Sequence, residues 1–111
     1  MNNIIDISTY NPNGNDKFFF DANIWMYLFC PIGGYKKDTV TKYDGFLKKA
    51  IQVEASIFIS SLVLSEFFND NYYKVLLSGE NIKIVTDDYD FARVGEPISI
   101  VTANSKLLEE N

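Results

Sequence analysis

The sequence contains no histidine and only one cysteine, Cys30, among its 111 residues. Without histidine the chain has no imidazole general base and almost none of the usual ligand sets of catalytic zinc. A lone cysteine excludes an internal disulfide and is typical of a reducing compartment. Cys30 stands beside Pro31 without a neighbouring cation, so it is better explained as a small buried residue than as a nucleophile. Any chemistry must therefore depend on carboxylates, hydroxyls, amines or a metal bound by oxygen.

Long apolar runs are also missing. No segment approaches the ~20 residues needed to cross a bilayer, and the chain does not begin with a basic stretch followed by an apolar one. The sequence therefore predicts a cytoplasmic protein with no membrane partner. The net charge of −5 argues against nonspecific nucleic-acid binding through a basic face, although acids gathered around bound divalent ions would offset part of this objection.

Hydrophobic residues make up 47% of the chain, which is enough for the core of one domain covering residues 1–111. Residues 1–16 are expected to form a polar N-terminal segment. Short apolar runs predict strands at 17–20, 57–60, 82–85 and 98–101. Helical spacing predicts helices at 24–29, 38–53, 61–77 and 104–110. In the second helix the expected buried stripe is Val40, Tyr43, Leu47 and Ile51.

Strands that alternate with helices predict an α/β fold. We expect a shortened three-layer α/β/α sandwich around a parallel sheet of four or five strands. In such a sheet the carboxyl ends of the strands lie at one edge, and ligands bind there.

Acidic residues follow the predicted strands at that edge. Asp21 follows Phe20, Asp88 and Asp90 follow Thr86, and Glu66 and Asp70 lie four residues apart in the helix after the second strand. Because carboxylates repel one another, a cluster of them favours a hard divalent cation held by oxygen ligands, Mg²⁺ or Mn²⁺.

Each acid also has a simpler explanation. Asp21 is well placed as a helix N-cap. Glu66 and Asp70 fit the solvated face of a helix. Asp87, Asp88 and Asp90 are common residues in turns and at helix starts. Only the joint arrangement of acids from three segments suggests a site.

Four segments, taken in order, resemble PIN-domain ribonucleases over residues 18–108, nearly the whole domain. Phe18-Phe-Phe-Asp21-Ala-Asn23 is similar to the opening motif of that family, and Ile57-Phe-Ile-Ser-Ser-Leu-Val-Leu-Ser-Glu66 is similar to the second. Ile82-Lys-Ile-Val-Thr86-Asp-Asp88-Tyr-Asp90-Phe is similar to the segment near the family's end, and Ile98-Ser-Ile-Val-Thr-Ala-Asn104 to its closing strand.

The resemblance implies a metal-dependent ribonuclease, often the toxin of a toxin–antitoxin pair, with RNA as substrate and an antitoxin protein or a second copy as partner. It implies Asp21, Glu66 and Asp88 as core acids, Asp90 as a further metal ligand, and Asn23 and Thr86 as supporting groups. The helical insert that the family usually places after the glutamate is missing here. Asp70 follows Glu66 almost at once and is the candidate for the remaining acid.

Substrate RNA would be contacted by lysine or arginine on its phosphates and by aromatic rings on its unpaired bases. The candidates are Lys17, Lys36, Lys37 and Arg93, with Tyr35 or Tyr89, although most of the lysines are explained as well by solvation.

Two other classes compete with a ribonuclease. One is a catalytically impaired PIN-like domain that serves as a protein- or RNA-binding module. The other is a phospho-acceptor or phosphatase domain on a similar sheet. A receiver domain would need paired acids after the first strand, and a haloacid-dehalogenase-like phosphatase would need Asp-x-Asp, whereas this chain has Asp21-Ala-Asn23.

Overall fold

The computed structural model describes residues 3–30, 34–59, 82–93 and 98–109. Its elements follow the order β1 (Asn3–Asp6), β2 (Lys17–Phe20), α1 (Ala22–Phe29), α2 (Lys37–Gln52), β3 (Ser56–Ile59), β4 (Lys83–Val85), the 3-10 helix η1 (Tyr89–Arg93), β5 (Ser99–Thr102) and α5 (Ser105–Glu109). The predicted strands and helices in these ranges are confirmed to within a few residues. The predicted helix at 61–77, with Glu66 and Asp70, lies outside the described residues.

The five strands form one sheet in the order β1-β5-β4-β2-β3, and every neighbouring pair is parallel. The predicted α/β class with an all-parallel sheet is therefore confirmed. Residues 1–16, expected as a polar segment, contain strand β1, which adds to the far edge of the sheet beside β5. Only two isoleucines, Ile4 and Ile5, mark this strand in the sequence, too short a run to be recognised without its partner.

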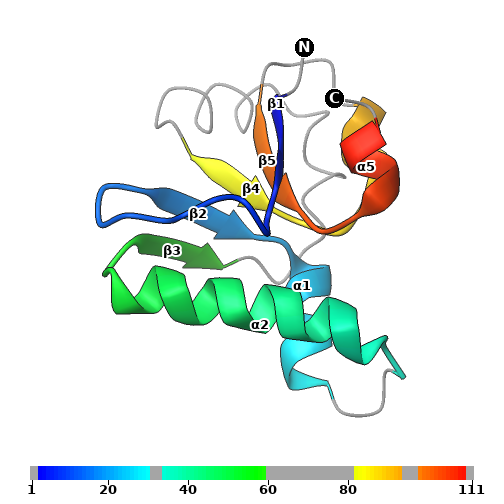
Figure 1. Ribbon diagram of the computed structural model, residues 1–111, viewed down its shortest axis with the longest axis horizontal. Coiled ribbons are helices and arrows are strands. Elements are labelled where there is room, and N and C mark those ends of the chain that lie inside the picture. The colour runs from blue at the N-terminus through cyan, green and yellow to red at the C-terminus, as the bar shows by residue number, and fades with distance from the viewer. Residues whose placement is uncertain (1–2, 31–33, 60–81, 94–97, 110–111) are drawn as a thin grey trace.

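Helices cover both faces of the sheet, as Figure 1 shows, with α1 and α2 on one side and α5 on the other. Alternation along each strand sends side chains to the two faces in turn. Phe18, Phe20, Val85 and Val101 join one core cluster with residues of α1 and α2. The other cluster joins Ile4, Ile84 and Ile100 to Phe91 of η1 and Leu107 of α5. The result is a three-layer sandwich.

The buried face of α2 is only partly the expected one. Tyr43 and Leu47 are buried as predicted, but the other two buried residues are Phe46 and Ala50, and Ile51 is 58% exposed. Residues 43, 46, 47 and 50 follow the i, i+3, i+4, i+7 spacing of a single helix face. Ile51 lies to one side of this face, so Ala50 rather than Ile51 is packed in the core.

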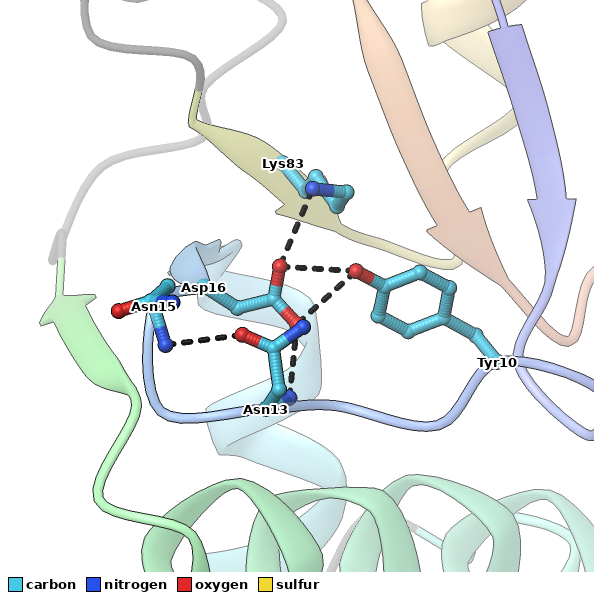
Figure 2. A network of polar contacts seen from close by, with 5 residues as sticks. All are labelled: Tyr10, Asn13, Asn15, Asp16 and Lys83. Atoms are coloured by element: carbon cyan, nitrogen blue, oxygen red, sulfur yellow. Dashed lines mark hydrogen bonds and ion pairs between the residues drawn. The ribbon is translucent and has the colours of Figure 1, made fainter.

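A polar network joins the segment before β2 to β4 at the amino edge of the sheet (Figure 2). Asp16 is 7% exposed and accepts hydrogen bonds from the Tyr10 hydroxyl at 2.8 and 2.9 Å and from the Asn13 N–H at 2.9 Å. The Lys83 Nζ, on the first residue of β4, lies 3.2 Å from Asp16 Oδ1. The Asp16 carbonyl accepts the N–H of Ser56, the first residue of β3. The Asp16 carboxylate therefore links the segment before β2 to β4, and the backbone carbonyl of the same residue links it to β3.

Burial alone would raise the pKa of Asp16, but the hydrogen bonds from Asn13, Tyr10 and Lys83 outweigh it, and the net pKa lies below its ordinary 3.8. Burial likewise opposes the charge on Lys83, yet Asp16 and Tyr10 raise the net pKa of Lys83. A carboxyl whose folded-state pKa is depressed stabilises the fold above its unfolded-state pKa. That contribution is lost as the pH falls from about 3.8 through the lower folded-state pKa.

We predict that Asp16→Asn lowers the free energy of unfolding by about 1–3 kcal/mol at pH 7, because Lys83 and Tyr10 lose a charged partner in a buried setting. The variant should also lose less stability than the wild type between pH 5 and pH 3. Urea unfolding at several pH values measures both effects. In the control Asp44→Asn, which breaks an exposed pair with Lys48, the cost should stay below about 0.5 kcal/mol. Equal losses in the two variants would contradict the prediction.

Candidate functional site

The chain reverses its direction of travel across the sheet between β2 and β4. After β2 it passes through α1 and α2 to β3 at one edge, whereas after β4 it passes to β5 on the other side. In open α/β sheets, ligands bind outside the carboxyl ends of the strands at such a switch point. The two residues that follow β2 and β4 are Asp21 and Thr86.

Asp21 is fully buried at this point. It is the N-cap of α1, as its sequence position also suggested, and its Oδ1 accepts the Ala22 N–H at 2.8 Å. Its Oδ2 accepts the hydroxyl of Thr86 at 2.8 Å, and its own N–H donates to the Val85 carbonyl at 2.9 Å. The parallel register, which places Phe20 beside Val85, sets Asp21 next to Thr86.

Thr86 links Asp21 to Asp88. Its hydroxyl donates to Asp21 and also accepts the Asp88 N–H at 3.0 Å. The half-buried Asp88 in turn accepts the Asp90 N–H on Oδ1 at 2.9 Å and so begins η1. The carboxylate of Asp21 and the backbone of Asp88 therefore contact the same buried threonine hydroxyl.

Asn23, expected as a supporting residue, lies in the first turn of α1. Its Oδ1 is buried and accepts no hydrogen bond from any residue that the structure describes. An orphaned buried acceptor normally faces water or an ion. Amide and carboxylate oxygens, the polar groups of Asn23, Asp21 and Asp88, are the donor types that Mg²⁺ and Mn²⁺ prefer.

The predicted set of metal ligands is only partly placed. Glu66 and Asp70 lie outside the described ranges, and Asp90 is exposed. Within the ranges described, no group of three or more acidic, histidine or cysteine side chains lies close enough to hold a metal ion. The structure thus brings together Asp21, Thr86 and Asp88 from the predicted set, with Asn23 in the same turn as Asp21.

Asp87, which the sequence suggested only as a turn residue, accepts two tyrosine hydroxyls. Tyr27 of α1 donates to its Oδ2 at 2.6 Å and Tyr43 of α2 to its Oδ1 at 2.9 Å. The Asn104 amide donates to its carbonyl at 2.7 Å. The two tyrosine pairs span 60 and 44 residues, so no local pattern could have revealed them.

Burial and the neighbouring Asp87 raise the pKa of Tyr27 far above its ordinary 10.0. Burial also raises the pKa of Tyr43, and this outweighs the opposite effects of its contacts with Thr102 and Ala103. Both hydroxyls therefore stay protonated and act as hydrogen-bond donors at neutral pH.

A cavity of about 330 Å³ opens beside this cluster. It is bounded by the C-terminal end of α1, the N-terminal end of α2 and residues that follow β4 and β5. The ring centroids of Tyr27 and Tyr35 lie 4.6 Å apart, and the two ring planes are tilted by 52°. The lining residues are Tyr27, Tyr35, Lys36, Thr39, Asp87, Ala103, Asn104 and Ser105.

Comparison with protein-family models, with curated proteins and with solved structures finds no match to this chain. Across the part of the chain that the structure describes, no helix is both long and apolar enough to cross a membrane.

We predict that Tyr43→Phe destabilises the protein by about 1–3 kcal/mol, because the Ala103 N–H loses its acceptor and Asp87 loses a donor. Tyr27→Phe removes only the bond to Asp87 and should cost less. Thermal and urea unfolding of both variants measure the difference. A larger loss in Tyr27→Phe would show that Tyr43 is not the main support of this edge.

Proposed function

We propose that the protein is a divalent-metal-dependent endoribonuclease whose active site lies at the carboxyl edge of β2 and β4. The observation that carries the proposal is the chain of contacts from Asp21 through Thr86 to Asp88. It links the carboxylate of Asp21 to the backbone of Asp88, from a distant segment, at the switch point of a parallel sheet. Asn23, whose buried Oδ1 accepts no hydrogen bond among the described residues, follows Asp21 by two positions. The resemblance of the sequence to PIN-domain ribonucleases agrees with this placement.

Asp21 and Asp88 would hold the Mg²⁺ or Mn²⁺ together with Glu66 and Asp70, and Asn23 and Thr86 would orient ligands around it. When bound, such an ion acidifies water and polarises a phosphate oxygen. Because the chain has no histidine, the proton must pass to a carboxylate or to solvent. Thr86 holds both the carboxylate of Asp21 and the backbone of Asp88, so it would help to position the two acids. A cytoplasmic location and an antitoxin partner belong to the same proposal.

One observation favours a second function. Asp21 is 0% exposed and both of its oxygens accept hydrogen bonds, which suits a purely structural N-cap as well as a ligand. In that case the domain would be an impaired PIN-like module that binds RNA or protein without cutting it. Cleavage and metal binding separate the two functions.

We predict that purified protein cleaves single-stranded RNA with Mn²⁺ and that EDTA stops cleavage. Asp21→Asn should abolish cleavage. The variant should remain folded, since the amide oxygen can still accept the Ala22 N–H, although the Thr86 hydroxyl loses its carboxylate acceptor. A quenched fluorescent RNA measures the rate. Asp44→Asn, an exposed acid on α2, changes the charge equally and should remain active. Full activity in Asp21→Asn would contradict the proposed site.

Divalent binding should also stabilise the fold. At ten times its dissociation constant, Mn²⁺ would add about 1.4 kcal/mol, which raises the melting temperature by roughly 5 °C in a domain of this size. Asp21→Asn should remove most of this increase, whereas Asp44→Asn should retain it. Calorimetric titration checks the binding directly. An unchanged melting temperature together with no heat of binding would argue for the second function.

The link through Thr86 can be tested separately. Thr86→Val removes the hydroxyl and should lower the cleavage rate at least tenfold, because a residue that positions acids affects the chemical step. Thr86→Ser keeps the hydroxyl and should restore most of the rate at the same stability. Recovery of the rate in Thr86→Val at high Mn²⁺ would show that the hydroxyl serves metal affinity rather than positioning of the acids.

A further inference from the structure

We propose that the cavity between Tyr35, Lys36 and Ser105 binds one nucleotide of a single-stranded RNA, with its base on Tyr35 and its phosphate on Lys36. The inference rests on the proposed function for the identity of the ligand. It adds a subsite to that function, because the cavity is lined by Asp87, which stands between Thr86 and Asp88 in the chain.

The walls of the cavity are held in place before any ligand arrives. Asp87 is clamped by Tyr27 and Tyr43. The Asn104 side chain donates to the Asp87 carbonyl and accepts the N–H groups of Lys106 and Leu107 at 2.9 and 3.2 Å. These hydrogen bonds fix the geometry of the wall. A rigid pocket needs little ordering when it binds, which favours affinity.

Other polar groups in the wall remain available. The ammonium of Lys36 and the hydroxyls of Tyr35, Thr39 and Ser105 make no hydrogen bond or ion pair within the described ranges. A cation with several hydroxyl donors is suited to a phosphate group, and Lys36 also offsets the negative charge that Asp87 contributes to the same lining. Lys36 is the N-cap of α2, so the positive end of that helix adds to the same charge.

The aromatic part of the cavity suits a base. The tilted rings of Tyr27 and Tyr35 form one wall, and Tyr35 is only partly buried. Stacking of an unpaired base on an aromatic side chain is a usual mode of single-strand recognition and tolerates any base. The volume of about 330 Å³ is near the lower end of ligand pockets, roughly 300 Å³, and suits one nucleotide rather than a longer segment.

The cavity also adjoins the proposed acids. Asp87 in its wall stands directly between Thr86 and Asp88 in the chain, and neighbouring Cα atoms are only about 3.8 Å apart. A strand that places one nucleotide in the cavity can therefore bring its adjacent phosphate to the acids. The sequence made Lys36, Lys37, Tyr35 and Tyr89 equal candidates for contacts with RNA. Of these, Lys36 and Tyr35 line the cavity, whereas Lys37 and Tyr89 do not.

Binding is tested without cleavage, in EDTA, with Asp21→Asn protein and a fluorescein-labelled single-stranded hexanucleotide of RNA. Tyr35→Ala should weaken binding at least fivefold, as expected for the loss of one stacked base. Tyr35→Phe keeps the ring and should bind within twofold of the parent. Lys36→Ala should reduce the slope of log K against log salt by about 0.7, the value for one phosphate contact on a single strand.

Matched controls lie outside the cavity. Lys37→Ala removes a neighbouring exposed lysine, and Phe29→Ala removes an aromatic ring on α1 that is 69% exposed. Both should leave affinity and salt slope unchanged. Circular dichroism and melting temperatures establish that all variants are folded. Equal weakening by Lys36→Ala and Lys37→Ala, or no effect of Tyr35→Ala, would overturn the subsite.

The subsite and the proposed chemistry fail in different ways. If the hexanucleotide binds through Tyr35 and Lys36 but wild-type protein with Mn²⁺ never cleaves it, the subsite stands and the ribonuclease proposal fails. If the wild type cleaves RNA while Tyr35→Ala and Lys36→Ala leave both KM and binding unchanged, the ribonuclease stands and the subsite fails.

Discussion

The parallel pairing of β2 with β4 is the constraint on which the rest of this molecule depends. It places Phe20 beside Val85, and so sets the first residue after each strand, Asp21 and Thr86, within a 2.8 Å hydrogen bond. The same pairing marks the point where the chain connections diverge toward the two edges of the sheet. Core packing, helix capping and the candidate site all meet at this junction. A change in register of one residue would separate Asp21 from Thr86 and turn the buried phenylalanines to the opposite face.

The two edges of the sheet use acidic residues for different purposes. At the amino edge, Asp16 is matched by a lysine and by hydroxyl and amide donors, so its charge holds strands together. At the carboxyl edge, Asp87 is matched by tyrosine hydroxyls, which are neutral donors and leave the negative charge in place. The negative charge retained at the carboxyl edge favours the proposed binding of a divalent cation by the neighbouring acids, and Lys36 offsets it on the cavity side. This contrast supports the assignment of function to the carboxyl edge.

Tyr27 and Tyr43 give that edge its stiffness. Their hydroxyls reach Asp87 from two different helices, and Tyr43 also accepts the Ala103 N–H at 2.9 Å after β5. One buried side chain thus joins α2 to the ends of β4 and β5. Such polar networks are valuable when every member is satisfied, because each unsatisfied member would be costly in a buried setting. The cavity beside the network takes its shape from this fixed frame.

The sequence by itself determined the fold class, the parallel sheet and the acids Asp21 and Asp88 at its carboxyl edge, because these follow from local apolar runs and from the residues directly after them. It also indicated the N-cap role of Asp21, which depends on neighbours in the chain. Only the tertiary structure decided three features: strand β1, the burial of Ala50 rather than Ile51 on α2, and the hydrogen bonds of two tyrosines to Asp87. Each of these depends on a partner tens of residues away. The periodicity of one segment does not determine which distant surface packs against it. For that reason the cavity lined by Tyr35 and Lys36 is defined only by the tertiary structure.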